Sequence, residues 1–549
     1  MKEKSNYFYL GLIGLVWFLA YVFCTVFWEQ KLGWDEVNYM AVAKGIVKDF
    51  DFSSRSYTIM GILKHGFPTN LINFPVFSVY LTLFFKLFGF DIHVAYFANW
   101  LCALGVCILI YFIFLMLSES NRKASFIVSL FYLFTPGIIR NCDTAMMEQG
   151  GCFLLCLLMF LILRDYSKGT FNYFTILKFS ISFLLLWLYK SLFLGIFFGA
   201  FIFIFLAYNP KLSGKKIKTG VLLPVFLLLS YGIFAVLFFI FKKFVFLPVA
   251  PMFTFTSQLE NSQAYATFSD AFFKDFPQNI FSNISYLFNI IVHSYFVYPT
   301  IYSNTARAIL PFTSYAVYVG VYFFLFIATI VLLFASWKKL TSMEKLFSCF
   351  AVISIISFNL IFNFLFSTTI ENIWRYNVYY LPLYLCFIGI IVRANFEYFK
   401  PFVNNHPKVS KVLLFVLFVF IYLPVSLSMI DVQSQYWEAY HSRAKMNGDV
   451  LRSIIKDTNP KFIYFNDGTH TTFTDYPIRQ VFKDATNDQL LAVNMILPGP
   501  IEYLFLRPTD WLFKNNQEII QMAGPILNDQ YKFLGFIKDQ QVIVYRLSN

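Results

Sequence analysis

The residues best suited to chemistry are charged side chains at the ends of long apolar runs. Asp35 and Glu36 follow the first run, in Gly-Trp-Asp-Glu-Val-Asn-Tyr, and Asp143 stands in the short gap between two later runs. Charged groups beside hydrocarbon are costly, so those that persist there are candidates for function. A carboxylate in such a place can take a proton from an attacking hydroxyl. The alternative role for each is to cap the helix that follows.

Cationic side chains stand at similar boundaries. Lys190 lies between two apolar runs in Leu-Tyr-Lys-Ser-Leu, and Arg375 precedes a later run in Asn-Ile-Trp-Arg-Tyr-Asn. Arg holds two phosphate oxygens at once and Lys acts as a point charge, so this pair suits a phosphate group. A lysine that snorkels to the interface is the alternative for Lys190. Weaker candidates in other outer segments are Lys64, His65, His293 and Arg307. For the two histidines, packing among aromatic side chains is the favoured interpretation.

The composition indicates which elements position these groups. The 549 residues are 58% apolar and 13% charged, with a mean hydropathy of +0.62, whereas a soluble protein is about 45–50% apolar and about 25% charged. We therefore expect a polytopic α-helical membrane protein. The net charge of +13 does not indicate a nucleic-acid partner, because Lys and Arg gather between apolar runs. Nearly all eight cysteines lie inside apolar runs, which argues against a disulfide scaffold or a zinc motif.

About eleven to 13 membrane spans are predicted, since a span needs roughly 20 apolar residues. Convincing runs lie near 7–28, 94–117, 124–140, 146–163, 175–189, 191–208, 220–241, 309–335, 345–366, 376–392 and 412–430. Polar residues, aromatics and prolines interrupt two further stretches, 74–90 and 280–301. Lys and Arg favour the cytoplasmic side, and the strongly basic loops all fall there only if 74–90 does not cross. We expect 74–90 to lie at the outer interface.

This topology places the N-terminus in the cytoplasm and makes the first apolar run (7–28) a signal anchor. It leaves four segments outside. They are a first loop (29–93), a short loop (141–145), a large loop (242–308) and the region from Asp431 onward. There the composition becomes that of a soluble protein, with strand-like runs at Phe462–Phe465 and Val542–Tyr545 between helix-like ones. Residues 1–430 are thus predicted to form a membrane domain and 431–549 a small extracytoplasmic α/β domain. The expected location is the inner, or plasma, membrane.

In their order and spacing these groups resemble the GT-C superfamily of membrane glycosyltransferases. The resemblance is to the branch that contains protein O-mannosyltransferases and the aminoarabinose transferases that modify lipid A. It rests on Asp35-Glu36-Val-Asn-Tyr39, on the segment from Phe74-Pro75 to Phe85-Lys86-Leu-Phe-Gly89, on Asp143, on Lys190-Ser-Leu and on Arg375-Tyr376. Two departures leave the sugar and the acceptor open. Ser191-Leu192 replace a small residue and a proline, and Lys64-His65 stand where many members have an acid.

The resemblance implies an enzyme that transfers a sugar from a polyprenyl-phosphate donor, with inversion, on the extracytoplasmic face. The acceptor would be a protein, a lipid or a glycan. Asp35 would be the base or acceptor-orienting carboxylate, and the other implied roles are catalysis for Glu36 and Asp143, donor-phosphate binding for Lys190, Arg375, Lys64 and Arg307, and substrate contacts for Tyr39, His65, Tyr376 and His293. A divalent metal is compatible with these carboxylates but not favoured, because Asp143-Thr-Ala lacks a second acid two residues on.

Two other classes of membrane protein would also use outer cations. A lipid-linked sugar flippase or a polysaccharide polymerase or ligase binds lipid phosphates, but such proteins generally lack a soluble C-terminal domain of this size and an acidic pair directly after the first span. A secondary transporter would show internal repeats and broken helices in mid-membrane. The sequence shows no repeats and no acidic residues at the centres of spans. A glycosyltransferase is the favoured interpretation.

Overall fold

The computed structural model describes a little under half of the chain. The described residues are 2–27, 34–49, 57–58, 76–142, 144–169, 173–189, 328–365, 378–417, 462–465, 476–479, 501–506, 531–537 and 542–547, with runs of one to three residues between 199 and 236 and the single residue 495. The predicted runs at 191–208, 220–241 and 309–335 lie mostly outside them, and the large loop 242–308 lies outside them entirely.

Four helices in the described part of the chain are long and apolar enough to cross a membrane. They are α1 (Lys2–Phe27), α5 (Ile92–Leu117), α8 (Glu148–Ser167) and α20 (Leu381–Asn405), which follows the short 3-10 helix η4 (Val378–Tyr380). Their positions agree with four of the predicted runs. The predicted total of about eleven spans extends beyond the described residues and stays a prediction.

Other predicted runs form helices as well. α9 (Tyr173–Tyr189) and α18 (Ser342–Leu365) coincide with two of them, and α21 (Pro407–Leu417) overlaps the start of a third. The run 124–140 is divided between α6 (Arg122–Leu133) and α7 (Pro136–Cys142). Proline lacks the N–H that would continue a helix and disfavours helical backbone in the residue before it, so Pro136 separates the two.

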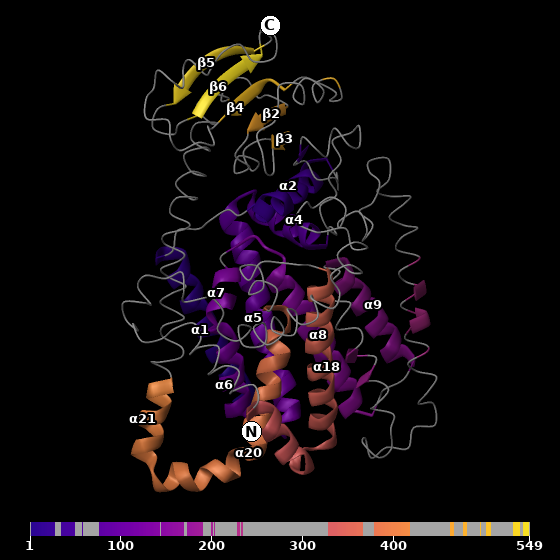
Figure 1. The fold of residues 1–549 in the computed structure, drawn as a ribbon, viewed down its shortest axis with the longest axis vertical. Coiled ribbons are helices and arrows are strands. Elements are labelled where there is room, and N and C mark those ends of the chain that lie inside the picture. The colour runs from indigo at the N-terminus through magenta and orange to yellow at the C-terminus, as the bar shows by residue number, and fades with distance from the viewer. Residues whose placement is uncertain are drawn as a thin grey trace.

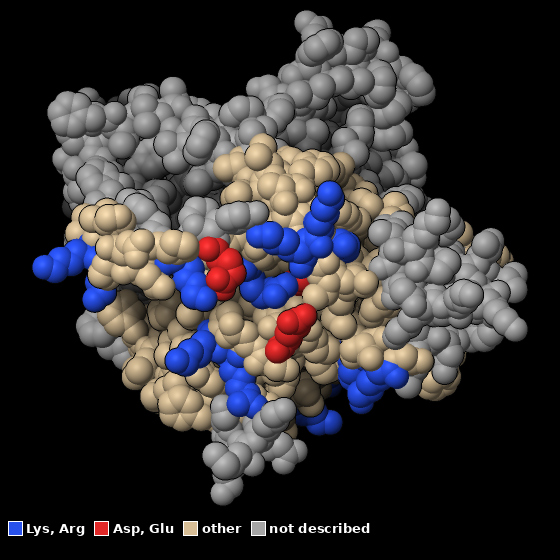
Figure 2. Space-filling model, turned by 90° about the horizontal axis from the view of Figure 1, so that it is seen from below, with Lys and Arg blue, Asp and Glu red and all other residues tan. Residues whose placement is uncertain are grey.

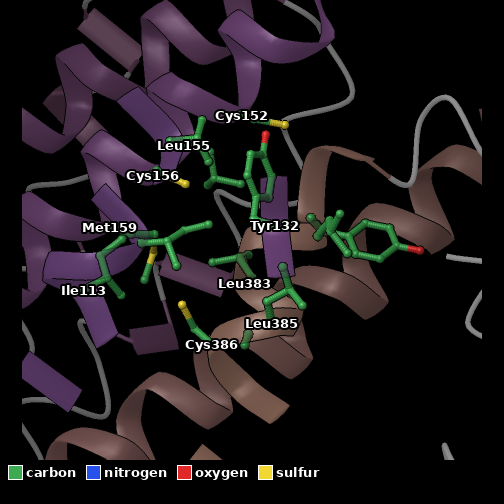
Figure 3. Packing of buried hydrophobic residues seen from close by; sticks show 14 of the residues in the cluster. Ile113, Tyr132, Cys152, Leu155, Cys156, Met159, Leu383, Leu385 and Cys386 are labelled. Atoms are coloured by element: carbon green, nitrogen blue, oxygen red, sulfur yellow. The ribbon is translucent and has the colours of Figure 1, made fainter. Parts of the chain in front are cut away.

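The helices pack around a large apolar core to which α5, α6, α8 and α20 contribute (Figure 3). Ile113 of α5, Met159 of α8 and Leu383 of α20 meet there with almost fully buried side chains. The ring of Tyr132 from α6 points toward Cys152 of α8 (Figure 3). In a bilayer such close packing is a main source of helix association. It holds together helices that are far apart in the sequence.

Lys and Arg side chains gather at the end of the bundle where α1 begins (Figure 2). The elements with ends on this side contain many such residues. In the start of α6, the end of α8, the 3-10 helix η3 (Trp337–Lys339), α20 and α21 they are Arg122, Lys123, Arg164, Lys168, Lys338, Lys339, Arg393, Lys400, Lys408 and Lys411. An excess of these residues in short loops marks the cytoplasmic side. The distribution agrees with the predicted cytoplasmic N-terminus, and the orientation itself remains a prediction.

A buried ion pair joins two helices at this basic end. Glu344 in the first turn of α18 is fully buried, and its carboxylate accepts hydrogen bonds from Nε of Arg393, at 2.8 Å, and from Nη2 of the same side chain. It also accepts from the backbone N–H of Thr341 at 2.9 Å, while Thr341 Oγ1 accepts from the Glu344 N–H at 3.3 Å. This reciprocal pair is a capping box. Glu344 therefore both starts α18 and fastens it to α20.

The described residues form a six-stranded sheet beyond the opposite end of the bundle (Figure 1). Its order is β1-β3-β2-β4-β6-β5. The strands are β1 (Tyr57–Thr58), β2 (Phe462–Phe465), β3 (Tyr476–Arg479), β4 (Tyr503–Leu506), β5 (Tyr531–Ile537) and β6 (Val542–Leu547). Strands β1, β3, β2 and β4 run parallel, and β6 is antiparallel to β4 and β5. The strands predicted at 462–465 and 542–545 are confirmed, whereas β1, which comes from the first loop, was not predicted.

Two helices lie across the bundle end that faces the sheet (Figure 1). They are α2 (Trp34–Asp49) and α4 (Val76–Phe88), and they pack against each other. The 13 residues of α4 extend about 20 Å at 1.5 Å per residue, while the hydrocarbon core of a bilayer is about 30 Å thick. This length agrees with the prediction that 74–90 does not cross the membrane.

Candidate functional site

A second apolar cluster, which we call the α2–α4 cluster, lies where these two helices meet the bundle. Its buried members are Tyr39, Met40, Ala43, Phe77, Leu81, Phe85, Ala95, Tyr96, Ala98, Ala145, Met147 and Tyr189. The Phe77 ring of α4 is central, because it contacts Tyr39 of α2 and Tyr189 of α9 edge-on, with ring centroids 5.4 Å and 6.0 Å apart. The cluster thus joins α2, α4, the start of α5, the segment before α8 and the end of α9.

Hydrogen bonds from α4 reinforce this junction. The Tyr80 hydroxyl donates to the Ala98 carbonyl of α5 at 2.8 Å and accepts from Cys102 Sγ at 3.3 Å. Burial raises the pKa of Tyr80, so the hydroxyl keeps the proton that it donates. Thr82 Oγ1 donates to the Ser78 carbonyl of its own helix at 2.8 Å, and the Ala43 carbonyl of α2 lies 3.5 Å from the same oxygen. The Tyr80 bond holds α4 against α5, and α2 packs on α4 mainly through apolar side chains.

Three segments that carry predicted site residues meet in the α2–α4 cluster. Asp35 lies one helical turn before Tyr39 in α2, the segment 144–147 directly follows Asp143, and Tyr189 directly precedes Lys190. Consecutive Cα atoms are about 3.8 Å apart. The cluster therefore collects the chain neighbours of all three predicted residues.

A fourth segment is connected through α8. Cys152 Sγ donates to the carbonyl oxygen of Val378 at 3.2 Å, and Val378 follows Arg375 by three residues. Cys152 lies one turn after Glu148 on α8. The chain from Val378 onward, which follows Arg375 in the sequence, therefore contacts the first half of this helix. The first turns of α8 thus contact chain from both the α2–α4 cluster and the Arg375 region.

The structure describes the predicted site residues to different extents. Tyr39 is the one whose side chain is described, and it is 3% exposed and packed on Phe77. Asp35 and Glu36 are described by their backbone, in the first turn of α2, where a helix favours negative charge. The remaining predicted residues lie outside the described part of the chain: Lys64, His65, Asp143, Lys190, His293, Arg307, Arg375 and Tyr376. Their roles stay predictions.

The sequence reasoning missed Asn99. This side chain is fully buried in α5, and its Nδ2 donates to the carbonyl oxygen of Met146, at 2.8 Å, and to that of Thr144. Both acceptors belong to the non-helical segment that follows Asp143, so Asn99 holds that segment in place. The sequence feature that could have indicated Asn99 is an amide side chain inside an apolar run. Only charged residues were considered there.

We expect Asn99→Leu to destabilise the protein. The change removes both N–H donors at nearly constant volume, and interhelical hydrogen bonds in membranes are worth about 0.6–2 kcal/mol, so the free energy of unfolding in detergent should fall by about 1–2 kcal/mol. The control is Asn395→Leu, because Asn395 is also buried but donates to the Ile391 carbonyl one turn earlier in its own helix, at 2.9 Å. Equal losses from the two changes would refute the role of Asn99 as an anchor.

The described residues hold no group of three or more His, Cys, Asp or Glu side chains that could bind a metal ion. The side chains of Asp35, Glu36 and Asp143 are not among them. The expectation that no metal takes part in catalysis therefore stays untested.

No family model and no curated protein matches this chain. Among solved structures, the fold is similar to that of ArnT from Cupriavidus metallidurans bound to undecaprenyl phosphate, with a TM-score of 0.53 and 10% identity over 99% of this chain and 98% of that one. It is also similar to an Archaeoglobus fulgidus oligosaccharyltransferase in complex with zinc and sulfate, with a TM-score of 0.52 and 12% identity over 98% of this chain and 73% of that one. Both are GT-C membrane glycosyltransferases. The predicted resemblance to this superfamily is confirmed at the level of the fold.

Proposed function

We propose that this protein is a membrane glycosyltransferase that moves a sugar from a polyprenyl-phosphate donor to an acceptor on the extracytoplasmic face. The observation that carries the proposal is the meeting, in the α2–α4 cluster, of the segments next to Asp35, Asp143 and Lys190. The cluster lies at the bundle end away from the Lys- and Arg-rich face (Figures 1 and 2). The GT-C-like fold and the undecaprenyl phosphate bound to ArnT support the choice of donor.

In the proposed reaction, the hydroxyl oxygen of the acceptor attacks the anomeric carbon of the donor sugar. Asp35 takes the hydroxyl proton or orients the hydroxyl, the bond between the anomeric carbon and the phosphate oxygen breaks, and polyprenyl phosphate leaves. Attack from the face opposite the phosphate inverts the anomeric configuration. Lys190 and Arg375 stabilise the negative charge that grows on the leaving phosphate.

The other predicted residues take supporting roles in this proposal. Lys64 and Arg307 add positive charge for the donor phosphate, and Glu36 and Asp143 are further carboxylates for the acceptor or the sugar. Contacts to the sugar or the acceptor are assigned to Tyr39, His65, Tyr376 and His293. The fully buried position of the Tyr39 side chain suggests that its contribution is to hold α2 in place.

Transfer by the purified protein in liposomes tests the proposal. The liposomes would carry a radiolabelled pool of polyprenyl-phosphate sugars together with protein, lipid and glycan acceptors from membranes. We expect the label to pass to an acceptor as unlabelled polyprenyl phosphate accumulates. A lipid-linked sugar flippase would instead move labelled lipid between the leaflets and leave the sugar attached. That result would replace the proposed function with this alternative.

A further inference from the structure

Tyr189, the last residue of α9, has a buried hydroxyl that the packing alone does not explain. The residue is 3% exposed, and its hydroxyl has no hydrogen-bond partner among the described residues. A buried hydroxyl without a partner costs free energy, so its surroundings must hold it there. The ring packs on Phe77 within the α2–α4 cluster, which accounts for one side of it.

The other side of Tyr189 faces the first turn of α8. A Cβ atom added to Gly150 would lie 1.9 Å from the Tyr189 hydroxyl oxygen and 2.7 Å from Cζ of the same ring. Non-bonded atoms do not approach so closely, so Tyr189 fits because residue 150 has no side chain. The hydroxyl therefore lies in a notch at Gly150.

This contact joins the ends of two segments. Tyr189 directly precedes Lys190, and α8 begins five residues after Asp143. Asn99 fixes the chain between Asp143 and α8 through its two hydrogen bonds. The start of α8, against which Tyr189 packs, is therefore itself held in place. The contact thus fixes the position of the last residue of α9, which directly precedes Lys190 in the sequence.

We infer that Gly150 and Tyr189 are positioning residues that fix the end of α9 on the first turn of α8, and thereby the point from which the proposed donor-phosphate cation Lys190 follows. The inference rests on the proposed function and assigns to this notch a role in recognising the lipid phosphate of the donor. In this inference both residues act through the position of Lys190 and not through contact with the donor. Their effect passes through the chain direction at the end of α9, where a displacement of about 1 Å can lower a rate by about 100-fold.

The test compares Gly150→Ala with Gly14→Ala, since a Cβ at Gly14 of α1 meets no atom within 4 Å. The KM values for donor and acceptor are measured in the liposome assay, and the affinity for undecaprenyl phosphate is measured separately on the detergent-solubilised protein. We expect Gly150→Ala to raise the donor KM and weaken lipid binding by about tenfold or more, with the acceptor KM unchanged. Gly14→Ala should match the wild type.

A second set of variants separates positioning from loss of folding. Tyr189→Phe removes the hydroxyl that the new methyl group would strike, so adding it to Gly150→Ala should recover part of the donor affinity. Tyr189→Leu adds no clash and should raise the donor KM even if Gly150→Ala does not fold. An unchanged donor KM in folded Gly150→Ala and Tyr189→Leu would overturn the inference while the proposed function stands. A wild type that neither transfers sugar nor binds undecaprenyl phosphate would overturn both.

Discussion

Asp35→Asn is expected to lower the rate of sugar transfer by about 100- to 10,000-fold, the range typical of a lost general base. Asparagine has nearly the same shape as aspartate but does not take up a proton at neutral pH. If the carboxylate only orients the acceptor hydroxyl, the loss should lie at the low end of this range. Binding of undecaprenyl phosphate should be unchanged, because the proposed phosphate ligands are cations elsewhere in the chain.

Initial transfer rates at equal amounts of folded protein check this prediction, with Asp49→Asn as the control. Asp49 is the last residue of α2 and Asp35 lies in its first turn, so the control makes the same chemical change at the other end of the helix. A helix-capping role for Asp35 predicts a different result, namely a loss of about 1 kcal/mol in stability with normal transfer by the folded fraction. Normal transfer by Asp35→Asn would remove this residue from the chemical step.

Glu344→Ala should give a large loss of stability. It removes a fully buried carboxylate that binds Arg393 and caps α18, and it leaves an Arg side chain that is 26% exposed without its partner. Breaking a buried ion pair from one side costs about 3–5 kcal/mol, and the partial exposure of Arg393 places the expected loss near about 3 kcal/mol. Thermal and denaturant unfolding of the detergent-solubilised protein measure it.

Glu397→Ala is the matched control at the same end of the bundle. The Glu397 side chain is 70% exposed and pairs with Lys400 at 3.2 Å, and exposed pairs of this kind contribute about 0–1 kcal/mol. The double variant Glu344→Ala with Arg393→Met should regain stability relative to Glu344→Ala, because no unpaired buried charge remains. If Glu344→Ala and Glu397→Ala lower the free energy of unfolding by the same amount, the ion pair does not hold α18 to α20.

Local composition was enough to place most of the helices that the structure describes. A backbone in hydrocarbon must satisfy its own hydrogen bonds, so a long apolar run there becomes a helix, as in α1, α5 and α8. The two predicted strands in the C-terminal region likewise follow from their β-branched and aromatic residues. The basic loops in the sequence predicted that Lys and Arg would lie together at one end of the bundle, and Figure 2 shows them there.

The contacts around the candidate site depend instead on which distant segments meet. Asn99 binds carbonyls 45 and 47 residues away, and neither its type nor its place in an apolar run reveals those partners. Gly150 and Tyr189 are equally unremarkable in sequence, because a glycine in an apolar helix acquires its role when a particular ring lies against it. Strand β1 has two residues, too few for a pattern, and exists through parallel pairing with β3. Such contacts arise from tertiary packing, because side-chain periodicity tells which face of an element is buried but not which neighbour covers it.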